Sequence, residues 1–265
     1  MTNLAESIRI DYGICTTCGA CVNVCPNNII QRDADASPIV HPGPECISCG
    51  HCIAICPSGA MTIPKEMEEA GFADAATLAR HLRSRRSIRL WKDSPVTKEE
   101  CEELIKITAH APSGCNTHPV KWVVVNDPEK VKAFVAASAE LLRQIPTDNR
   151  MYGLAAGLLR KLDAGNDILC RNAPALLIAV ANPKEDLGLV DSIISLTYAD
   201  VYAPSIGLGT CWAGFVMILL NVFPPLHKIL GIPEGYKAQF ALLAGHPKYT
   251  FKQIPPRDMP EIFWS

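Results

Sequence analysis

The cysteines constrain this chain more than any other feature. Eight of the twelve fall into two blocks, and each member of the second block lies 31 residues after its counterpart in the first. The blocks are Cys15, Cys18, Cys21 and Cys25, and then Cys46, Cys49, Cys52 and Cys56. A repeat of this length predicts two equivalent units, each too small to bury a hydrophobic core without an inorganic centre.

The spacing within each block is C-x2-C-x2-C-x3-C-P, which resembles that of bacterial ferredoxins with two clusters. In such ferredoxins three closely spaced cysteines surround one [4Fe-4S] cluster, and the fourth binds the other cluster. The resemblance therefore implies one cluster on Cys15, Cys18, Cys21 and Cys56, and a second on Cys46, Cys49, Cys52 and Cys25. Pro26 and Pro57 fix φ after the two remote ligands.

Two other uses of these cysteines are less consistent with the pattern. A zinc site pairs two C-x2-C segments, which leaves the third cysteine of each block unexplained. Disulfides fit poorly with an intracellular chain. The remaining cysteines, Cys101, Cys115, Cys170 and Cys211, share no ligand spacing, and for them a structural role is favoured over a redox role.

Charge and hydropathy exclude several classes of protein. The formal net charge is −2, and the pI is near 6.4, so we expect no nucleic acid as a partner. The first residues, MTNLAESIRIDYG, contain no basic stretch followed by an apolar one, so no secretory signal is expected. The longest apolar run, residues 213–220, is too short for a bilayer, which requires about 20 residues. These observations predict a soluble, cytoplasmic protein without a membrane segment.

The cluster repeat predicts a small domain at residues 1–64, opened by a strand near residues 8–11 and closed by one near 60–63. Residues 65–86 are charged and alanine-rich and lead into the first helix of a second domain, residues 65–265. In that domain we expect helices at 97–111, 128–144 and 186–208, the last interrupted at Pro204. Strands are expected at 121–126, 175–181 and 238–245, and a loop at 144–163. This alternation indicates an α+β domain with a central sheet.

Four motifs follow one another in the second domain. They are SRRSIRLWKD at 84–93, APSGCNTHPVKW at 111–122, GLGTCWAGF at 207–215 and GHPKYTFKQIPPR at 245–257. Taken alone, each is compatible with a helix end or a turn. In this order they resemble the FMN-dependent nitroreductase-like family over most of residues 75–260. The resemblance implies an FMN-binding α+β domain with a mostly antiparallel central sheet.

The resemblance also implies which residues hold FMN. A phosphate monoester carries nearly two negative charges and, without a glycine-rich loop, requires cations with several donors. Arg85 and Arg257, with the Ser87 hydroxyl, are the candidates for the phosphate, and Arg89 would face the pyrimidine edge of the flavin. The full cofactor-binding set is Arg85, Arg86, Ser87, Arg89, Ser113, Asn116, Trp212, Ala213, Gly214, Lys248 and Arg257.

In this family a serine and an asparagine of the second motif reach FMN from the other subunit. Their counterparts, Ser113 and Asn116, imply a homodimer with FMN at its interface. His118 stands where glutamine is usual and Val120 where tryptophan is usual, so the contacts on the substrate side are expected to differ. His118 and His246 are otherwise expected to be structural histidines.

Two hypotheses about function follow. In the first, an enzyme passes electrons from two [4Fe-4S] clusters to FMN and on to a nitroaromatic, a quinone or an activated alkene. Because no G-x-G-x-x-G run opens a strand–helix unit, the electron donor is expected to be reduced ferredoxin, or NAD(P)H that stacks in the open flavin site. In the second, the chain is a non-catalytic electron-transfer or flavin-holding module that serves a partner protein. No catalytic residue is identified by the sequence.

Overall fold

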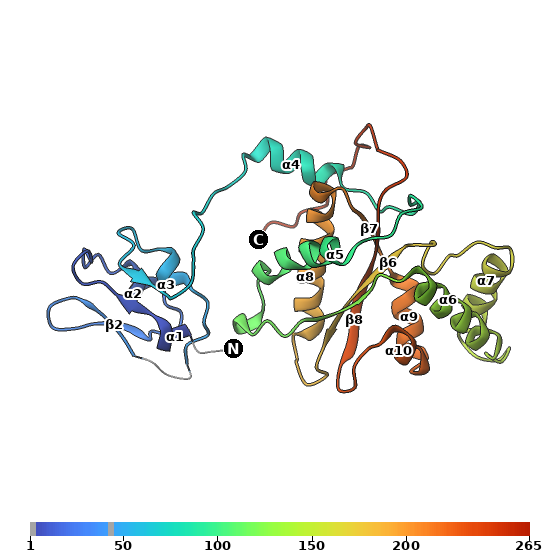
Figure 1. Cartoon of the computed structure of the whole chain (residues 1–265), viewed down its shortest axis with the longest axis horizontal. Coiled ribbons are helices and arrows are strands. Elements are labelled where there is room, and N and C mark those ends of the chain that lie inside the picture. The colour runs from blue at the N-terminus through green and yellow to red at the C-terminus, as the bar shows by residue number, and fades with distance from the viewer. Residues whose placement is uncertain (1–3, 42–44) are drawn as a thin grey trace. The chain divides into compact units, whose positions relative to one another are not determined.

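The computed structural model describes residues 4–41 and 45–265, and the chain separates into two compact units. The N-terminal unit comprises Met1–Phe72 with Gly114–Thr117, and the C-terminal unit comprises Ala73–Ser113 with His118–Ser265. Figure 1 labels the elements of both units. The domain boundary expected after residue 64 stays a prediction. Residues 1–3, where the first expected domain begins, lie outside the described residues.

The N-terminal unit consists of short elements around the cysteine blocks. Its helices are α1 (Leu4–Ser7), α2 (Ala20–Val24) and α3 (His51–Ala54), and its strands are β1 (Arg9–Ile10), β2 (Ile30–Arg32), β3 (Pro38–Val40) and β4 (Met61–Thr62). Strand β1 pairs antiparallel with β4, as expected for the opening and closing strands of this domain. Strands β2 and β3 form a second antiparallel pair, which the sequence analysis did not predict.

The 31-residue sequence repeat is also a repeat of backbone conformation. Three pairs of described residues separated by 31 positions have positive φ, with values between 50° and 77°. They are Thr17 and Ser48, Gly19 and Gly50, and Asn28 and Gly59. Residues other than glycine seldom adopt this conformation, so its recurrence shows that each cysteine block folds into the same loop.

The C-terminal unit contains the larger sheet and most of the helices. Its helices are α4 (Ala75–Ser84), α5 (Lys98–Lys106), α6 (Pro128–Arg143), α7 (Tyr152–Asp163), α8 (Gly188–Tyr202), α9 (Gly214–Val222) and α10 (Pro225–Leu230). Its strands are β5 (Lys121–Val125), β6 (Ala175–Ala181), β7 (Gly209–Trp212) and β8 (Lys237–Gly245). The strand order is β5-β6-β8-β7, and every pairing is antiparallel. The expected α+β architecture with a central sheet is confirmed.

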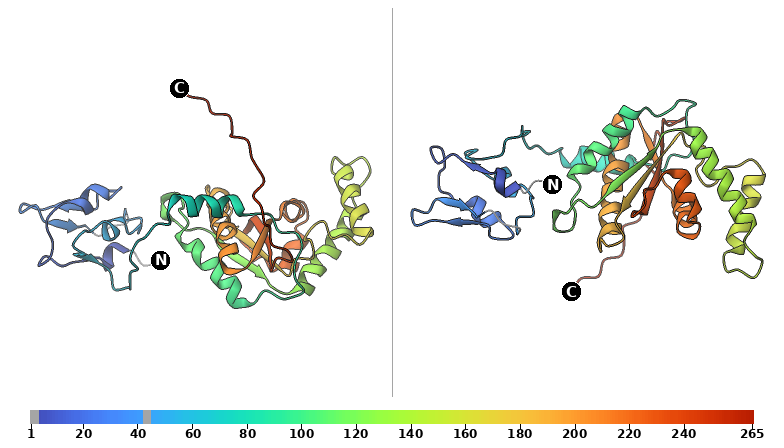
Figure 2. Two further views of the ribbon diagram at one scale, coloured as in Figure 1. Left: turned by 90° about the horizontal axis from the view of Figure 1, so that it is seen from above. Right: turned by 60° about the horizontal axis from the view of Figure 1, so that its bottom comes forward.

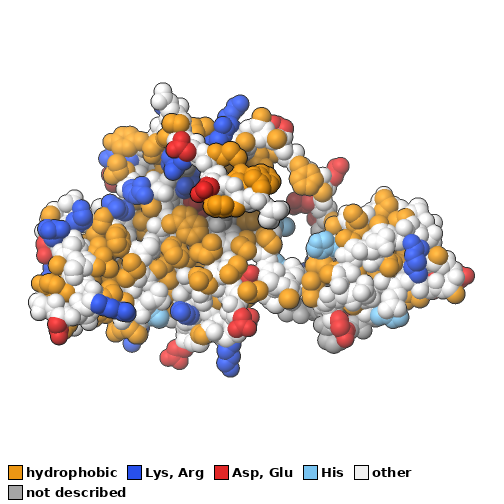
Figure 3. Space-filling view, turned by 180° about the vertical axis from the view of Figure 1, so that it is seen from behind, with side chains coloured by type: hydrophobic (Ala, Val, Ile, Leu, Met, Phe, Trp, Pro, Cys, Tyr) orange, Lys and Arg blue, Asp and Glu red, His pale blue; other side chains and the backbone are white. Residues whose placement is uncertain are grey.

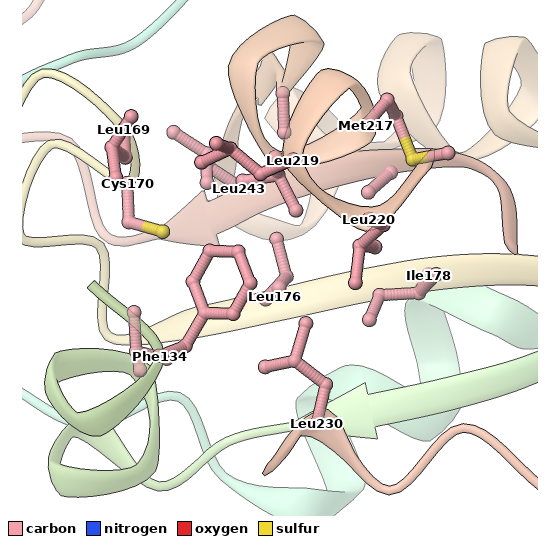
Figure 4. Close-up of a cluster of buried hydrophobic side chains, with 14 of the residues drawn as sticks. Phe134, Leu169, Cys170, Leu176, Ile178, Met217, Leu219, Leu220, Leu230 and Leu243 are labelled. Atoms are coloured by element: carbon pink, nitrogen blue, oxygen red, sulfur yellow. The ribbon is translucent and has the colours of Figure 1, made fainter. Parts of the chain in front are cut away.

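Both faces of this sheet are covered by helices (Figures 1 and 2). Strand β6 is buried throughout, and its alternate side chains enter two separate hydrophobic clusters. Leu176 and Ile178 join residues of α6, α9 and α10, whereas Leu177 joins residues of α5 and α8. In the first cluster Phe134 of α6 points toward Leu176 (Figure 4). The uninterrupted apolar sequence of β6 therefore reflects burial on both faces.

Several helices begin where the sequence predicts. Thr97 and Glu100 form a reciprocal capping box at the start of α5, and Pro128 occupies the first turn of α6. The interruption expected at Pro204 is confirmed, because α8 ends at Tyr202 and a 3-10 turn follows over Ala203–Ile206. The prediction of a loop at residues 144–163 is wrong, because most of this segment forms α7. Asn149, whose side chain accepts from the Met151 amide, closes a turn just before this helix.

Strand β7 and helix α9 were also missed. Strand β7 spans four residues, too few to display an alternating pattern, and the apolar run at 213–220 belongs mostly to α9. In the part of the chain that the structure describes, no helix combines the length and the hydropathy required to cross a bilayer.

The end of β8 provides a test of this packing. A Cβ added at Gly245 would lie 2.6 Å from Trp91 Cε3 and 2.8 Å from Pro174 Cδ. We expect Gly245→Ala to lower the free energy of unfolding by about 1–3 kcal/mol, because the surrounding atoms belong to the rigid rings of Trp91 and Pro174. Chemical unfolding followed by circular dichroism measures the change.

The matched control is Gly157→Ala in α7, where an added Cβ meets nothing within 4 Å. This control should be neutral or more stable by about 0.5–1 kcal/mol, because alanine favours a helix interior. Equal stability of the two variants would contradict the close approach at Gly245.

Candidate functional site

Four cysteines of the N-terminal unit line one pocket. Cys46, Cys49 and Cys52 of the second block share it with Cys25, the last cysteine of the first block. Burial, and then the neighbouring thiols of Cys49 and Cys25, raise the pKa of Cys52 to about 11. Thiols this close repel one another once ionised, and a cationic centre between them would relieve that repulsion. The structure therefore brings together the set that the ferredoxin spacing implies for one cluster.

The other set is also interleaved between the blocks. Burial raises the pKa of Cys21, and the nearby thiols of Cys56 and Cys18 contribute to the rise. Cys15, which begins the same loop, donates its backbone N–H to Asp11 O at 3.1 Å. Among the residues that the structure describes, no three His, Cys, Asp or Glu side chains converge as they would around one metal ion.

Three of the other four cysteines are buried in the C-terminal unit. Burial raises the pKa of Cys101 to about 11, and it also raises the pKa of Cys170 and of Cys211. Such thiols stay protonated at neutral pH and pack as small apolar side chains. Cys115 differs, because it is exposed and has a φ of 47°.

Three of the four motifs of the C-terminal unit meet at the β7 edge of the sheet. The segment after α4 runs beside β7 and the end of β8, and three backbone hydrogen bonds of 2.8–3.0 Å hold it there. They join Ile88 N to Thr210 O, Lys92 N to His246 O, and Lys248 N to Leu90 O. Trp91 and Pro247 add an isolated β-bridge. Residues from opposite ends of this unit are thereby placed side by side.

Four arginines line one pocket beside this edge. They are Arg83, Arg85, Arg86 and Arg257, and the pocket has a volume of about 640 Å³. Arg86 is held locally, because its Nη1 donates to Arg83 O at 2.8 Å and to Arg85 O at 2.6 Å. The Nη1 atom of Arg85 is buried and makes no hydrogen bond to the described residues. Arginine side chains clustered in this way are suited to an anionic ligand.

An acidic residue that the sequence analysis missed lies behind this pocket. Asp200 of α8 is only 4% exposed, and its carboxylate accepts hydrogen bonds from Thr210 and Trp212. Its Oδ2 also lies 3.4 Å from Arg85 Nη1. The signal available in the sequence was a single acid within an otherwise apolar helical stretch, LTYADVYA.

The other expected cofactor residues near this edge are on β7 or beside it. Trp212 ends β7 and packs its ring against Phe240, with ring centroids 5.3 Å apart. Ala213 is buried, and Gly214 begins α9. Burial raises the pKa of Cys211 on β7, and the most strongly opposing group is the nearby guanidinium of Arg89.

Ser87 and Lys248 complete the residues expected at this edge. Ser87 is half-buried and follows Arg86 directly, and Lys248 is exposed beside Leu90. Neither side chain is among those that line the arginine pocket.

The second motif is divided between the two units, because Gly114–Thr117 group with the N-terminal unit. It leads into β5, the strand at the opposite edge of the sheet from β7. Ser113 Oγ accepts a hydrogen bond from His118 N at 3.0 Å. Asn116 belongs to the short segment that groups with the N-terminal unit. Within the C-terminal unit, Ser113 is therefore not among the residues that line the arginine pocket.

His246 has two side-chain partners that the sequence could not identify. Its Nε2 lies 2.9 Å from Glu100 Oε1, and its Nδ1 lies 3.2 Å from Ser94 Oγ. Hydrogen bonds from the Thr97 backbone, and then the contact with His246, lower the pKa of Glu100. These contacts join the start of α5 to the residue after β8, which is the structural role expected of His246.

Comparison with known proteins defines the class of this chain. Residues 82–246, well over half of the chain, match the nitroreductase family, and the chain belongs to that family. Residues 7–57 match the 4Fe-4S dicluster domain. Both parts of the resemblance noted in the sequence are thereby confirmed, together with the ferredoxin-like and nitroreductase-like fold class.

Individual relatives match less than two thirds of this chain. FMN reductase [NAD(P)H] of Bacillus subtilis is 29% identical over 63% of this chain and 64% of its own length. Iodotyrosine deiodinase 1 of Rattus norvegicus is 31% identical over 63% of this chain and 60% of its own length. This chain thus spans less than two thirds of either relative.

Solved structures show the same fold. A nitroreductase with bound FMN from Bacteroides fragilis has a TM-score of 0.58 at 18% identity, covering 71% of this chain and 98% of that chain. A second one with bound FMN, from Desulfitobacterium hafniense, has a TM-score of 0.56 at 23% identity, covering 71% and 97%.

Proposed function

We propose that this protein is a cytoplasmic FMN-dependent oxidoreductase in which two [4Fe-4S] clusters supply electrons to the flavin, which reduces an electrophilic small molecule. The observation that carries the proposal is the pocket lined by four arginines, in a nitroreductase-family chain that also contains two interleaved cysteine sets. Bound FMN supplies the chemistry that joins one-electron clusters to a two-electron acceptor.

The cysteines support one cluster on Cys46, Cys49, Cys52 and Cys25, and another on Cys15, Cys18, Cys21 and Cys56. The first set surrounds a pocket that isoleucines enclose on several sides, including Ile8, Ile29 and Ile47. An apolar shell around thiolates lowers solvent access to a cluster and thereby influences its reduction potential. The repeated backbone conformation provides an equivalent loop for the second cluster.

The arginine pocket supports binding of the FMN phosphate. Arg85, Arg86 and Arg257 supply fork-shaped donors, and the guanidinium nitrogens of Arg85 other than Nη1, which lies beside Asp200, have the chemistry to pair with phosphate oxygens. We assign Ser87 and Lys248 to the same end of the cofactor. Arg89, Trp212, Ala213 and Gly214 are assigned to the ring, because they lie on or beside the same sheet edge.

A second copy of the chain would complete this site. We assign Ser113 and Asn116 to the FMN of the partner subunit, because in one chain their motif leads to the opposite edge of the sheet. The C-terminal unit also exposes large apolar side chains at its surface (Figure 3), among them Tyr249, Phe263 and Trp264. Residues after β8 form an extended arm (Figure 2) that would be covered in a homodimer.

The electron donor in this proposal is reduced ferredoxin or NAD(P)H, and the acceptor is a nitroaromatic, a quinone or an activated alkene. The Bacillus subtilis relative is named for NAD(P)H, whereas the dicluster domain matched at the N-terminus favours a protein donor. The Rattus norvegicus relative is named for a different acceptor, iodotyrosine. The acceptor is therefore assigned only as a class of electrophile.

The cluster assignment predicts which substitutions act together. Cys25→Ser and Cys46→Ser should each remove the same cluster, so that iron falls from about eight to about four atoms per chain and the double variant loses no more. Cys15→Ser should remove the other cluster. Iron analysis and electron paramagnetic resonance of the reduced, anaerobically purified proteins measure this.

The matched control is Cys115→Ser, which should keep all of the iron, because Cys115 is exposed and lies outside both blocks. If Cys25→Ser removed the same cluster as Cys15→Ser, each block would hold its own cluster and the interleaved assignment would be wrong.

The phosphate assignment predicts the effect of Arg257→Gln. The dissociation constant for FMN should rise about tenfold, the scale of one lost charge-assisted contact, while that for riboflavin stays unchanged. Lys252→Gln is the control, because Lys252 is an exposed cation of the same arm but does not line the pocket. Equal effects of both variants on FMN would indicate general attraction of anions instead of a phosphate contact.

The proposed route of electrons, from the donor through the clusters and the flavin to the acceptor, can be tested by reducing and reoxidising the holoprotein. Reduced ferredoxin, NADH and NADPH are each mixed anaerobically with the oxidised holoprotein, and bleaching of cluster and flavin absorbance is followed. Subsequent mixing with nitroaromatics or quinones should restore both spectra rapidly. Slow reoxidation by every electrophile would instead favour a non-catalytic electron-transfer module.

A further inference from the structure

Asp200 joins two segments that the proposed function assigns to the flavin. Its Oδ2 accepts a hydrogen bond from Trp212 Nε1 at 3.0 Å, and its Oδ1 accepts one from the Thr210 hydroxyl. The same Oδ2 lies 3.4 Å from Arg85 Nη1. Trp212 and Thr210 belong to β7, whereas Arg85 directly follows α4. One carboxylate therefore contacts the phosphate side and the ring side of the proposed site.

Burial makes these contacts necessary. The side chain of Asp200 is 5% exposed, and that of Arg85 is 30% exposed. An ionised carboxylate is costly to bury unless it is paired and hydrogen-bonded, and the partners of Asp200 meet both requirements. The carboxylate is held by its hydrogen bonds to β7, and its ion pair with Arg85 Nη1 places one edge of the guanidinium beside it.

We propose that Asp200 is a positioning residue that orients the guanidinium of Arg85 toward the arginine pocket and thereby gives the protein its preference for a phosphorylated flavin over riboflavin. The inference rests on the proposed binding of FMN. Asp200 itself is not expected to contact the flavin, because Arg85, Thr210 and Trp212 cover its carboxylate.

The chemistry of arginine supports this role. A free arginine side chain samples many rotamers, and ordering it for a ligand costs conformational entropy. A guanidinium has five N–H donors in a rigid fork, so one nitrogen can face Asp200 while others remain available to a phosphate. Arg86 is already oriented by the carbonyls of Arg83 and Arg85, and Asp200 supplies the corresponding restraint for Arg85.

If Asp200 acted on the pocket only through its negative charge, its removal would change FMN binding in the direction opposite to that expected for a positioning residue. The carboxylate is a negative charge behind a pocket proposed to hold a phosphate, so its removal alone would strengthen the attraction for FMN. Positioning predicts that its removal weakens FMN binding. The sign of the change therefore separates the two roles.

The test uses the full-length chain, purified anaerobically with its iron and then freed of flavin. FMN and riboflavin are titrated separately, and flavin fluorescence gives the ratio of their dissociation constants. We expect Asp200→Asn to lower the preference for FMN roughly tenfold with the riboflavin constant unchanged, since the amide loses the charge that attracts Arg85, while its one oxygen can still accept from Trp212 and its NH2 can donate to the Thr210 hydroxyl. Arg85→Gln should cause the same loss, and the double variant should lose no more.

Asp191→Asn is the matched control. Asp191 is a buried acid of the same helix, nine residues before Asp200 and therefore about 13 Å away along the helix axis. This variant should keep the wild-type preference. If Asp200→Asn does not fold, Arg85→Lys replaces it, because lysine keeps the charge but lacks the oriented fork; it should lose preference to a similar degree.

Three results would overturn the inference: an unchanged preference in Asp200→Asn, tighter binding of FMN by that variant, or additive losses in the double variant. An unchanged preference in Arg85→Lys would do the same where that variant is used. A wild-type protein that binds riboflavin as tightly as FMN would instead remove the proposed phosphate site, and this inference with it.

Discussion

The proposed site depends on the backbone hydrogen bonds that hold the segment after α4 against the β7 edge of the sheet. The Ile88 N–H donates to Thr210 O of β7, the Lys92 N–H donates to His246 O, and the Lys248 N–H donates to Leu90 O. Arg85 and Arg257 are 172 positions apart in sequence, so no local structure could place them together. The sheet is the support on which two segments from opposite ends of the unit converge, as is usual for binding sites built on loops.

The N-terminal unit depends on a different constraint. Its hydrophobic cluster contains seven buried residues, two of which are the proposed cluster ligands Cys21 and Cys52. A core of this size contributes little stability by itself, so binding of the inorganic centres and folding of the unit are expected to be coupled. The cysteines are thus structural and functional at once, and this explains why their spacing alone was sufficient to predict the unit.

Features with a strong local cause could be predicted from the sequence. The helix that begins after Thr97 and the fully apolar strand β6 each depend on residues close together in the chain, and both were located correctly. The class of the C-terminal unit followed from four motifs in order. Strand β7 could not be predicted, because its four residues become a strand only by pairing with β8.

The same distinction holds for the candidate site. Arg85, Arg86 and Arg257 were proposed because each belongs to a contiguous motif, and the cysteines were proposed because their spacing is regular. The other charged residues of the site, Asp200 and Arg83, belong to no motif or regular spacing in the sequence. Asp200 is separated by 115 positions from Arg85, and Arg83 entered the pocket only because α4 presents it beside Arg85.

The charge balance of the arginine pocket links these observations. Four guanidinium groups around one space repel one another, and the contact with Asp200 offsets a single positive charge on the buried side. The pocket is therefore left with an excess of positive charge toward its open side, where a phosphate dianion would restore the balance. Because a guanidinium has donors on more than one edge, Arg85 can pair with the acid behind it and with a phosphate in front of it. A lysine in its place could offer a charge to both, but its single ammonium group could not fix the direction of either contact.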